Sequence, residues 1–188
     1  MYYKKLVQSG KTIFDMNDLA QIWRIKDRSH LKVAVNRLFK RGDIQRIQRG
    51  IYALGEDFDE WELASKLKNP SYVSLATVLR KYNIIFQEQG NTVTCVSNNT
   101  LTKKAGGLTF CYYKIKDEIL VNNKGLVLSG KTTVATPERA VCDQLYLFPD
   151  FYFDDLGNLN FDKLRDISAI YKKRLAREVE KIIKNYDQ

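Results

Sequence analysis

The most constraining feature of this sequence is a close succession of two helical patterns and a short hairpin pattern within residues 14–54. The stretch "FDMNDLAQIWRI" repeats apolar residues at helical spacing, and Asp15 or Asn17 can accept hydrogen bonds from the first turn. The stretch "KDRSHLKVAVNRLFKRG" predicts a second helix, with Asp27 as N-cap and Gly42 as the stop. Because only "RIKD" separates them, the spacing predicts a helix-turn-helix.

A hairpin is predicted directly after the second helix. In "DIQRIQRGIYAL" the apolar residues indicate two short strands around a turn at "QRG". Arg46 and Arg49 lie on or near its tip, which is the layout of a wing whose cations meet phosphates or the minor groove. Residues 1–56 are therefore predicted to form a winged helix-turn-helix.

The predicted second helix divides into two faces at about 100° per residue. Its apolar face holds Leu31, Ala34, Val35 and Leu38, with Phe39 at the margin. Its opposite face holds Ser29, Lys32, Val33, Asn36, Arg37 and Lys40. Asn can bond an adenine edge, Val can contact a thymine methyl group, and Lys and Arg reach guanine or phosphate. This face therefore carries the side chains that a major groove can use.

The charge of the chain is concentrated in the same region. Residues 1–50 contain 12 Lys or Arg and 4 Asp or Glu, whereas the other 138 residues contain 19 and 18. A local field of this sign attracts a polyanion, although a basic surface that only aids solubility remains the alternative. The side chains expected to contact double-stranded DNA are Arg28, Ser29, His30, Lys32, Val33, Asn36, Arg37, Lys40, Arg41, Arg46, Gln48 and Arg49.

The rest of the chain, residues 57–188, is expected to form a second domain, in which a helix at 57–70 connects the two parts. We expect helices at 71–85, 136–148 and 161–171 and at the C-terminus, the last with a stripe of Tyr171, Leu175, Val179, Ile182 and Tyr186. Strands are expected at 92–97, 107–115, 118–123, 125–128 and 132–136. The predicted fold class is α+β, with the winged helix-turn-helix followed by a small mixed sheet flanked by helices.

The stretch "GLVLSGKT", Gly125 to Thr132, fits the phosphate-loop pattern G-x-x-x-x-G-K-[ST]. A phosphate loop needs small, flexible residues and a helix that begins at the Lys, but here Leu, Val and Leu favour a strand and Thr132, Thr133 and Val134 continue it. We therefore interpret the match as accidental and expect two strands around a Ser129–Gly130 turn.

No other pattern predicts catalysis, a metal or a cofactor. The single histidine, His30, has no acidic or thiol companion at a ligand spacing, and Cys95, Cys111 and Cys142 are expected to be buried free thiols. The acidic segment around Asp154 lacks the order of a calcium loop, and "DEILV" with Lys116 lacks the second motif of a metal-dependent nuclease. Without a long apolar run or a secretory signal, we expect a cytoplasmic, non-enzymatic protein that does not bind membranes.

Four stretches occur in the order seen in a known family: "SYVSLATVLRKYNII", "TVTCVSN", "LTFCYYKI" and "VATPERAVCDQLYL". Over residues 12–148 the chain resembles the AbiEi-type antitoxins, most specifically in "ATPERAVCDQLYL". It departs from the family at Asn83, where the pattern favours Gly. The resemblance implies a type IV antitoxin of an abortive-infection phage defence system. In such a system the winged helix represses its own operon at repeated half-sites, and the second domain counteracts a nucleotidyltransferase toxin without a stable complex.

Two other functions remain open from the sequence. One is a transcriptional regulator whose second domain senses a ligand or assembles subunits, and a neighbouring nucleotidyltransferase gene would argue against it. The other is a metal-dependent nuclease or a nucleotidase, for which Lys131 of the phosphate-loop match would be needed.

Overall fold

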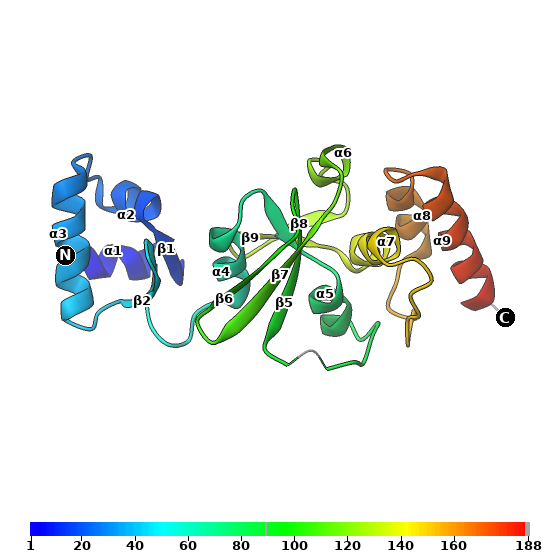
Figure 1. Ribbon diagram of the computed structural model, residues 1–188, viewed down its shortest axis with the longest axis horizontal. Helices are drawn as coiled ribbons and strands as arrows, with labels where there is room; N and C mark the ends of the chain where they lie inside the picture. Colours follow the sequence, from blue (N-terminus) through cyan, green and yellow to red (C-terminus); the bar gives the residue numbers. More distant parts are fainter. Residues whose placement is uncertain (89, 187–188) are drawn as a thin grey trace. The chain divides into compact units, whose positions relative to one another are not determined.

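The computed structural model describes residues 1–88 and 90–186, which form two compact units, Met1–Leu67 and Lys68–Gln188. We name them the N-terminal unit and the C-terminal unit. Both combine helices and strands, so the chain is of mixed α+β class, as the sequence predicted (Figure 1). No helix in the described ranges is long and apolar enough to cross a membrane.

The N-terminal unit places helices around a small antiparallel sheet of order β1-β3-β2. Its elements are α1 (Tyr2–Gln8), β1 (Ile13–Asp15), α2 (Met16–Trp23), α3 (Arg28–Lys40), β2 (Gln45–Gln48), β3 (Ile51–Ala53) and α4 (Glu60–Leu67). Apolar side chains of α1, α2, α3 and the β1 strand form its core, among them Leu6, Phe14, Leu19, Leu31 and Leu38. The core fixes which face of α3 is buried.

The predicted helix starts are confirmed by hydrogen bonds. Asp15 caps α2 by accepting from the backbone N–H groups of Asn17 and Asp18, and the Asp18 carboxylate accepts from the N–H of Asp15 in return. Asp27 caps α3 by accepting from the N–H of His30 at 2.6 Å. Each acceptor satisfies a donor that a helix leaves unpaired in its first turn.

Helix α1 and strand β1 were not expected from the sequence. The short α1 has one fully buried residue, Leu6, and the ring of Tyr2 lies 4.9 Å from that of Trp23 in α2. Strand β1 has only three residues, and it is held by pairing with β3. Both elements therefore depend on tertiary contacts that a local pattern does not contain.

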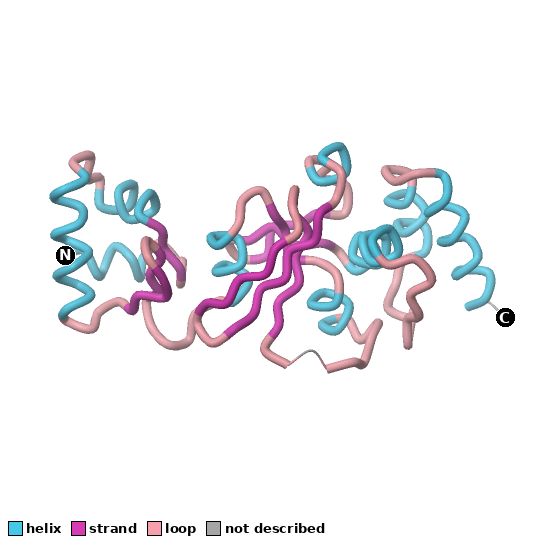
Figure 2. Tube along the Cα trace, viewed as in Figure 1, coloured by secondary structure: helices cyan, strands magenta, loops and turns pink. Residues whose placement is uncertain are grey.

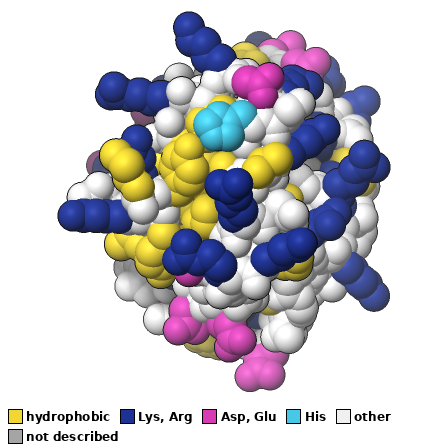
Figure 3. Space-filling model, turned by 90° about the vertical axis from the view of Figure 1, so that its left-hand side faces the viewer, with side chains coloured by type: hydrophobic (Ala, Val, Ile, Leu, Met, Phe, Trp, Pro, Cys, Tyr) yellow, Lys and Arg dark blue, Asp and Glu magenta, His cyan; other side chains and the backbone are white. Residues whose placement is uncertain are grey.

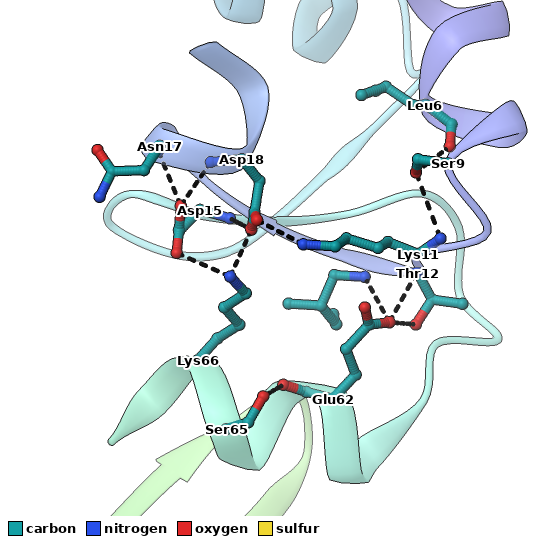
Figure 4. A network of polar contacts seen from close by, with 11 residues as sticks. Leu6, Ser9, Lys11, Thr12, Asp15, Asn17, Asp18, Glu62, Ser65 and Lys66 are labelled. Atoms are coloured by element: carbon teal, nitrogen blue, oxygen red, sulfur yellow. Dashed lines mark hydrogen bonds and ion pairs between the residues drawn. The ribbon is translucent and has the colours of Figure 1, made fainter. Parts of the chain in front are cut away.

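Helix α4 belongs to the N-terminal unit, so the unit ends at Leu67 and not at residue 56 as we expected. A polar network attaches it (Figure 4). The carboxylate of Glu62, itself buried, accepts from the N–H of Thr12 at 2.7 Å and from the N–H of Ile13 at 3.2 Å. Lys66 donates to Asp18 at 2.6 Å and to Asp15 at 3.0 Å. These contacts attach α4 to residues 12–18 of the N-terminal unit, whereas we expected residues 57–70 to begin the second domain as a connecting helix.

The same network shifts two pKa values. Burial disfavours the ionised Asp18 carboxylate, but hydrogen bonds from Lys11 and Lys66 outweigh burial and lower the pKa of Asp18. Burial likewise disfavours the Lys66 ammonium, and the contacts with Asp18 and Asp15 outweigh it and raise the pKa of Lys66. Both groups are therefore held in their charged forms.

The C-terminal unit is built on a mixed sheet, whose strands are magenta in the middle of Figure 2. The strand order is β6-β7-β5-β4-β9-β8, and β4–β9 and β5–β7 are parallel pairs. Its strands are β4 (Ser71–Val73), β5 (Thr92–Ser97), β6 (Leu101–Ala105), β7 (Leu108–Lys114), β8 (Leu126–Ser129) and β9 (Thr132–Ala135). Its helices are α5 (Ala76–Lys81), α6 (Asp117–Leu120), α7 (Pro137–Leu147), α8 (Phe161–Ser168) and α9 (Lys173–Tyr186). Helices α7, α8 and α9 pack together at one end of the sheet (Figure 1).

Two predicted elements of this unit are wrong, and one strand was not predicted. The expected helix at 71–85 begins with the central strand β4, because Tyr72 and Val73 are buried between β5 and β9, and only 76–81 are helical. The expected strand at 118–123 is the short helix α6, and strand β6 was missed.

Asn83, which stands where the resembled family favours Gly, has a φ of +56°, a left-handed conformation that Asn tolerates.

The phosphate-loop match forms the hairpin β8–β9, as predicted, and no helix begins at its Lys. Gly125 has a φ of +72°, and a Cβ atom there would lie 2.8 Å from the Cβ of Arg139 and 2.8 Å from Ile167. The first glycine of the pattern therefore allows close packing of the hairpin on α7 and α8, and its backbone is not presented to an anion.

The predicted caps of α7 and α8 are confirmed, and α7 carries a buried ionic network. Thr136 and Asn160 accept from N–H groups of the first turns of α7 and α8. In α7 the guanidinium of Arg139 and the carboxylate of Asp143 are completely buried, with 3.4 Å between Nε and Oδ1. Asp143 also accepts from Ser74, Tyr72 and Tyr171, at 2.6–3.0 Å. The network joins the central strand to the helical end of the unit.

In the last helix, α9, the predicted apolar stripe is confirmed at Leu175 and Val179, and the buried residue of its last turn is Ile183 rather than Ile182. Two of the three cysteines, Cys95 and Cys142, are buried, Cys111 is half-buried, and all three are free thiols. These thiols lie in or beside the core of the C-terminal unit, which agrees with the expected packing role for the two buried ones.

Candidate nucleic-acid interface

Helix α3 presents the face that the sequence predicted. Leu31, Ala34, Val35 and Leu38 are buried, which turns the opposite side of the helix to the solvent. The exposed residues of α3 include Arg28, Ser29, His30, Lys32, Val33, Asn36, Arg37 and Lys40. Val33 is 49% exposed and adds an apolar side chain to this otherwise polar face.

The hairpin β2–β3 lies next in the chain and carries the other predicted cations. Arg46 on β2 pairs with Tyr52 on β3, and the ladder is irregular between Arg46 and Gln48. Arg49 is exposed in the turn, where Gly50 adopts a φ of +83° that the turn requires. The irregularity interrupts the alternation of side chains between the two faces of β2, and Gln48 is half-buried.

A groove between α3 and the hairpin brings part of the predicted set together. Four predicted residues line it, two from the helix and two from the hairpin: Lys32, Asn36, Arg46 and Arg49. Its remaining lining is largely apolar and comes from Met16, Val35, Phe39, Gly50 and Tyr52. The helix and the hairpin thus present their polar groups to a common hollow, with an amide and three cations at its sides.

Other predicted residues lie outside this groove. His30, Val33 and Arg37 project from the side of α3 that turns away from Lys32 and Asn36, at about 100° per residue. Arg41 forms an ion pair with Asp43, with 3.1 Å between Nε and Oδ2, so its charge is partly neutralised within the chain. The predicted set therefore divides into residues along the groove and residues along the opposite edge of α3.

The surface around α3 carries mostly positive charge. In Figure 3, Lys and Arg side chains spread over this side of the molecule, and the acidic side chains gather mainly at its margins. At typical ionic strength such charges attract a polyanion over a distance of about 8–10 Å. The surface combines this field with an exposed helix narrow enough to enter a major groove.

Sequence reasoning missed the apolar lining of the groove. Phe39, at the margin of the apolar face, is 44% exposed, and Met16 and Tyr52 come from α2 and β3. Only the exposed position of Phe39 could have been inferred from the helical pattern. Met16 and Tyr52 reach the groove through the packing of α2 and β3, which no local pattern contains.

The described residues show no group of three or more His, Cys, Asp or Glu side chains that could hold a metal ion. In comparisons with known proteins, neither the model of any protein family nor any curated protein matches the chain. The arguments about function therefore depend on the residues themselves.

Proposed function

We propose that the N-terminal unit is a winged helix-turn-helix that binds double-stranded DNA. In this proposal α2 and α3 are the helix-turn-helix, α3 enters a major groove, and the hairpin β2–β3 is the wing. The observation that carries the proposal is the groove in which Asn36 and Lys32 of α3 meet Arg46 and Arg49 of the hairpin. An amide and cations so placed can bond base edges and phosphates together.

In the mechanism we propose, the helix reads the sequence and the cations position the protein. Asn36, Val33, Lys32 and Ser29 lie near base edges, and Arg37, Lys40, Arg46 and Arg49 mostly neutralise phosphates. Because Arg41 forms an ion pair with Asp43, we expect it to contribute less to the neutralisation of phosphates than its position in the sequence indicated. Two copies would occupy paired half-sites of the operator.

We further propose that the chain is a type IV antitoxin that represses its own operon. This step depends on the resemblance of residues 12–148 to the AbiEi-type antitoxins. On that basis the C-terminal unit counteracts a nucleotidyltransferase toxin. Co-expression of each unit with the product of a neighbouring toxin gene tests the assignment. Rescue by the N-terminal unit alone, or no rescue by either unit or the full chain, would leave a plain transcriptional regulator as the better description.

Two substitutions test the DNA-binding mechanism. Arg49→Ala should weaken binding to every sequence and reduce the slope of log affinity against log salt by about 1, because one phosphate contact is lost. Asn36→Ala should cost about 1–3 kcal/mol on the chain's own upstream region and little on random DNA. Fluorescence anisotropy over a range of salt concentrations measures both effects.

Lys131→Ala is the matched control, since it removes an exposed cation from the β8–β9 turn of the other unit. It should leave both affinities unchanged. Equal losses on specific and random DNA for Asn36→Ala would refute its role in reading bases. ATP turnover that disappears with Lys131→Ala would favour a nucleotidase instead.

A further inference from the structure

The groove between α3 and the hairpin β2–β3 has exposed cations on two sides. Lys32 comes from α3, and Arg46 and Arg49 come from the hairpin. The ion pairs in the described part of the N-terminal unit use other cations, so these three keep their charges for an outside anion. The described lining of the groove contains no Asp or Glu. The groove is therefore suited to a ligand that carries negative charge along both of its sides.

Between these cations the groove is lined by apolar side chains, which we name the apolar floor: Met16, Val35, Phe39 and the ring of Tyr52. Val35 is buried and Met16 and Tyr52 are half-buried, so they lie deeper than the exposed cations. The ring of Phe39 is 44% exposed. On this side of the molecule apolar side chains gather among the Lys and Arg side chains (Figure 3). A ligand that covers the floor with C–H groups removes apolar surface from water, which favours binding.

We propose that this groove holds the sugar–phosphate backbone of one DNA strand and that its apolar floor selects deoxyribose over ribose. The inference rests on the proposed function, in which α3 enters a major groove and the hairpin is the wing. A sugar–phosphate backbone separates each major groove from the next minor groove. A strand must therefore pass between a helix in one groove and a hairpin at the other.

The two kinds of lining match the two parts of such a strand. Its phosphates would bind Lys32 on one side and Arg46 and Arg49 on the other. The sugar between two phosphates would then lie over the apolar floor, against the exposed ring of Phe39. Deoxyribose is the more apolar of the two sugars, because its C2′ carbon carries only hydrogen atoms.

The selection against ribose follows from the chemistry of the floor. A 2′-hydroxyl placed against Phe39 and Met16 would lose its water and gain no hydrogen-bond partner from either side chain, which costs free energy. A deoxyribose in the same place leaves no polar group unpaired. The 2′-hydroxyl is the group by which proteins distinguish RNA from DNA. The floor would therefore make the chain selective for DNA without any contact to a base.

A base stacked on the Phe39 ring is the alternative occupant, because aromatic rings beside cations also bind single strands. The position of the cations favours the backbone. Because they come from both sides of the floor, successive phosphates of one strand can be held across it. A base lying flat on Phe39 would instead have to leave its duplex, and unstacking it costs free energy.

The test measures the affinity of the full-length protein for duplexes of the chain's own upstream region. Each duplex has about 30 base pairs, enough for two half-sites one helical turn apart. In a series of such duplexes a single deoxynucleotide is replaced by a ribonucleotide, at each position of each strand in turn. We expect the replacement to weaken binding about tenfold at one or two adjacent positions of one strand in each half-site, as an unpaired buried hydroxyl should. Replacements elsewhere should have little effect.

Variants of Phe39 connect the sensitive positions with the floor. Phe39→Ser supplies a partner for the 2′-hydroxyl, so the ratio of deoxy to ribo affinity there should fall from about ten to about one. Phe39→Leu keeps the floor apolar and should keep the ratio. Neither should change the slope of log affinity against log salt, because no charge is altered. Each ratio compares two probes on one protein, so a general loss of stability cancels.

Tyr3→Ser is the matched control. It removes an aromatic ring that is 42% exposed, close to the exposure of Phe39, from α1 of the same unit and outside the lining of the groove. The ratio of deoxy to ribo affinity at the sensitive positions should remain about ten, as in the wild type.

Several outcomes would overturn this inference and leave the proposed function intact. They are specific binding with no ribose-sensitive position, a ratio that persists unchanged in Phe39→Ser, or a ratio that Tyr3→Ser abolishes as well. Tighter binding of either single strand than of the duplex would identify a stacked base as the occupant and overturn the inference too. A protein that does not distinguish its unmodified upstream duplex from random DNA would refute the proposed function, and the inference with it.

Discussion

Arg139 is the side chain whose loss should cost the C-terminal unit most. Its guanidinium donates to the carbonyls of Lys124 at 2.7 Å and Ile119 at 2.8 Å and faces the buried Asp143. Burial raises the pKa of Asp143, and Arg139 opposes that shift. Arg139→Met should therefore lower the free energy of unfolding by about 3–5 kcal/mol, since it leaves a buried carboxylate without its countercharge and the carbonyls of Lys124 and Ile119 without the donor that Arg139 supplies. Urea unfolding of the full chain measures the loss.

Arg165→Met is the control for that substitution. Arg165 also makes two ion pairs, with Asp162 and Glu180, but they lie at the surface, where such pairs contribute little to stability. The free energy of unfolding should hardly change. A loss as small for Arg139→Met as for Arg165→Met would mean that the buried network does not hold the unit together.

At the residue scale, the sequence predicts which groups are exposed better than it predicts their partners. The outward residues of α3 follow from its helical period alone, because the position of the buried apolar face determines which residues lie on the opposite, exposed face. Arg139 and Asp143 also lie in a predicted helix, yet their partners Tyr72 and Tyr171 are 67 and 28 residues away, respectively, in the chain. Such a network depends on the tertiary fold, so the sequence gives no local sign of it.

At the scale of the element, changes at the N-cap of α3 should affect stability and the proposed DNA affinity differently. Asp27→Ala removes the acceptor of the His30 N–H and should cost about 1 kcal/mol of stability. It also removes an anion from the face proposed to bind DNA, so affinity should rise at low salt. Asp27→Asn keeps an acceptor and should raise affinity with little loss of stability. Thermal unfolding and DNA anisotropy of both variants check this, and equal destabilisation by Asn and Ala would contradict the capping role.

Elements with their own start signals could be predicted, and those held only by their neighbours could not. Helices α2, α3, α7 and α8 begin after side chains that accept hydrogen bonds from their first turns. Strand β4 has three residues, and its central position between β5 and β9 overrides a helical pattern that continues into α5. The four-residue helix α6 is too short for a period to appear in its sequence.

At the scale of the whole molecule, the position of the domain boundary decides which fragment should fold by itself and carry the proposed DNA-binding surface. A fragment of residues 1–67 keeps α4, whose Glu62 accepts from Thr12 and Ile13 and whose Leu63 is fully buried. A fragment of residues 1–56 loses the charged acceptor of these two N–H groups, and hydrogen bonds to a charged group contribute about 1.5–3 kcal/mol each. It also loses the burial of Leu63. We expect the longer fragment to unfold cooperatively and to bind the upstream DNA, and the shorter one to be far less stable. Glu62→Ala within residues 1–67 should reproduce part of the loss, whereas Glu60→Ala, an exposed change in the same helix, should not. Equal stability of the two fragments would place the boundary at residue 56 and make α4 a connection after all.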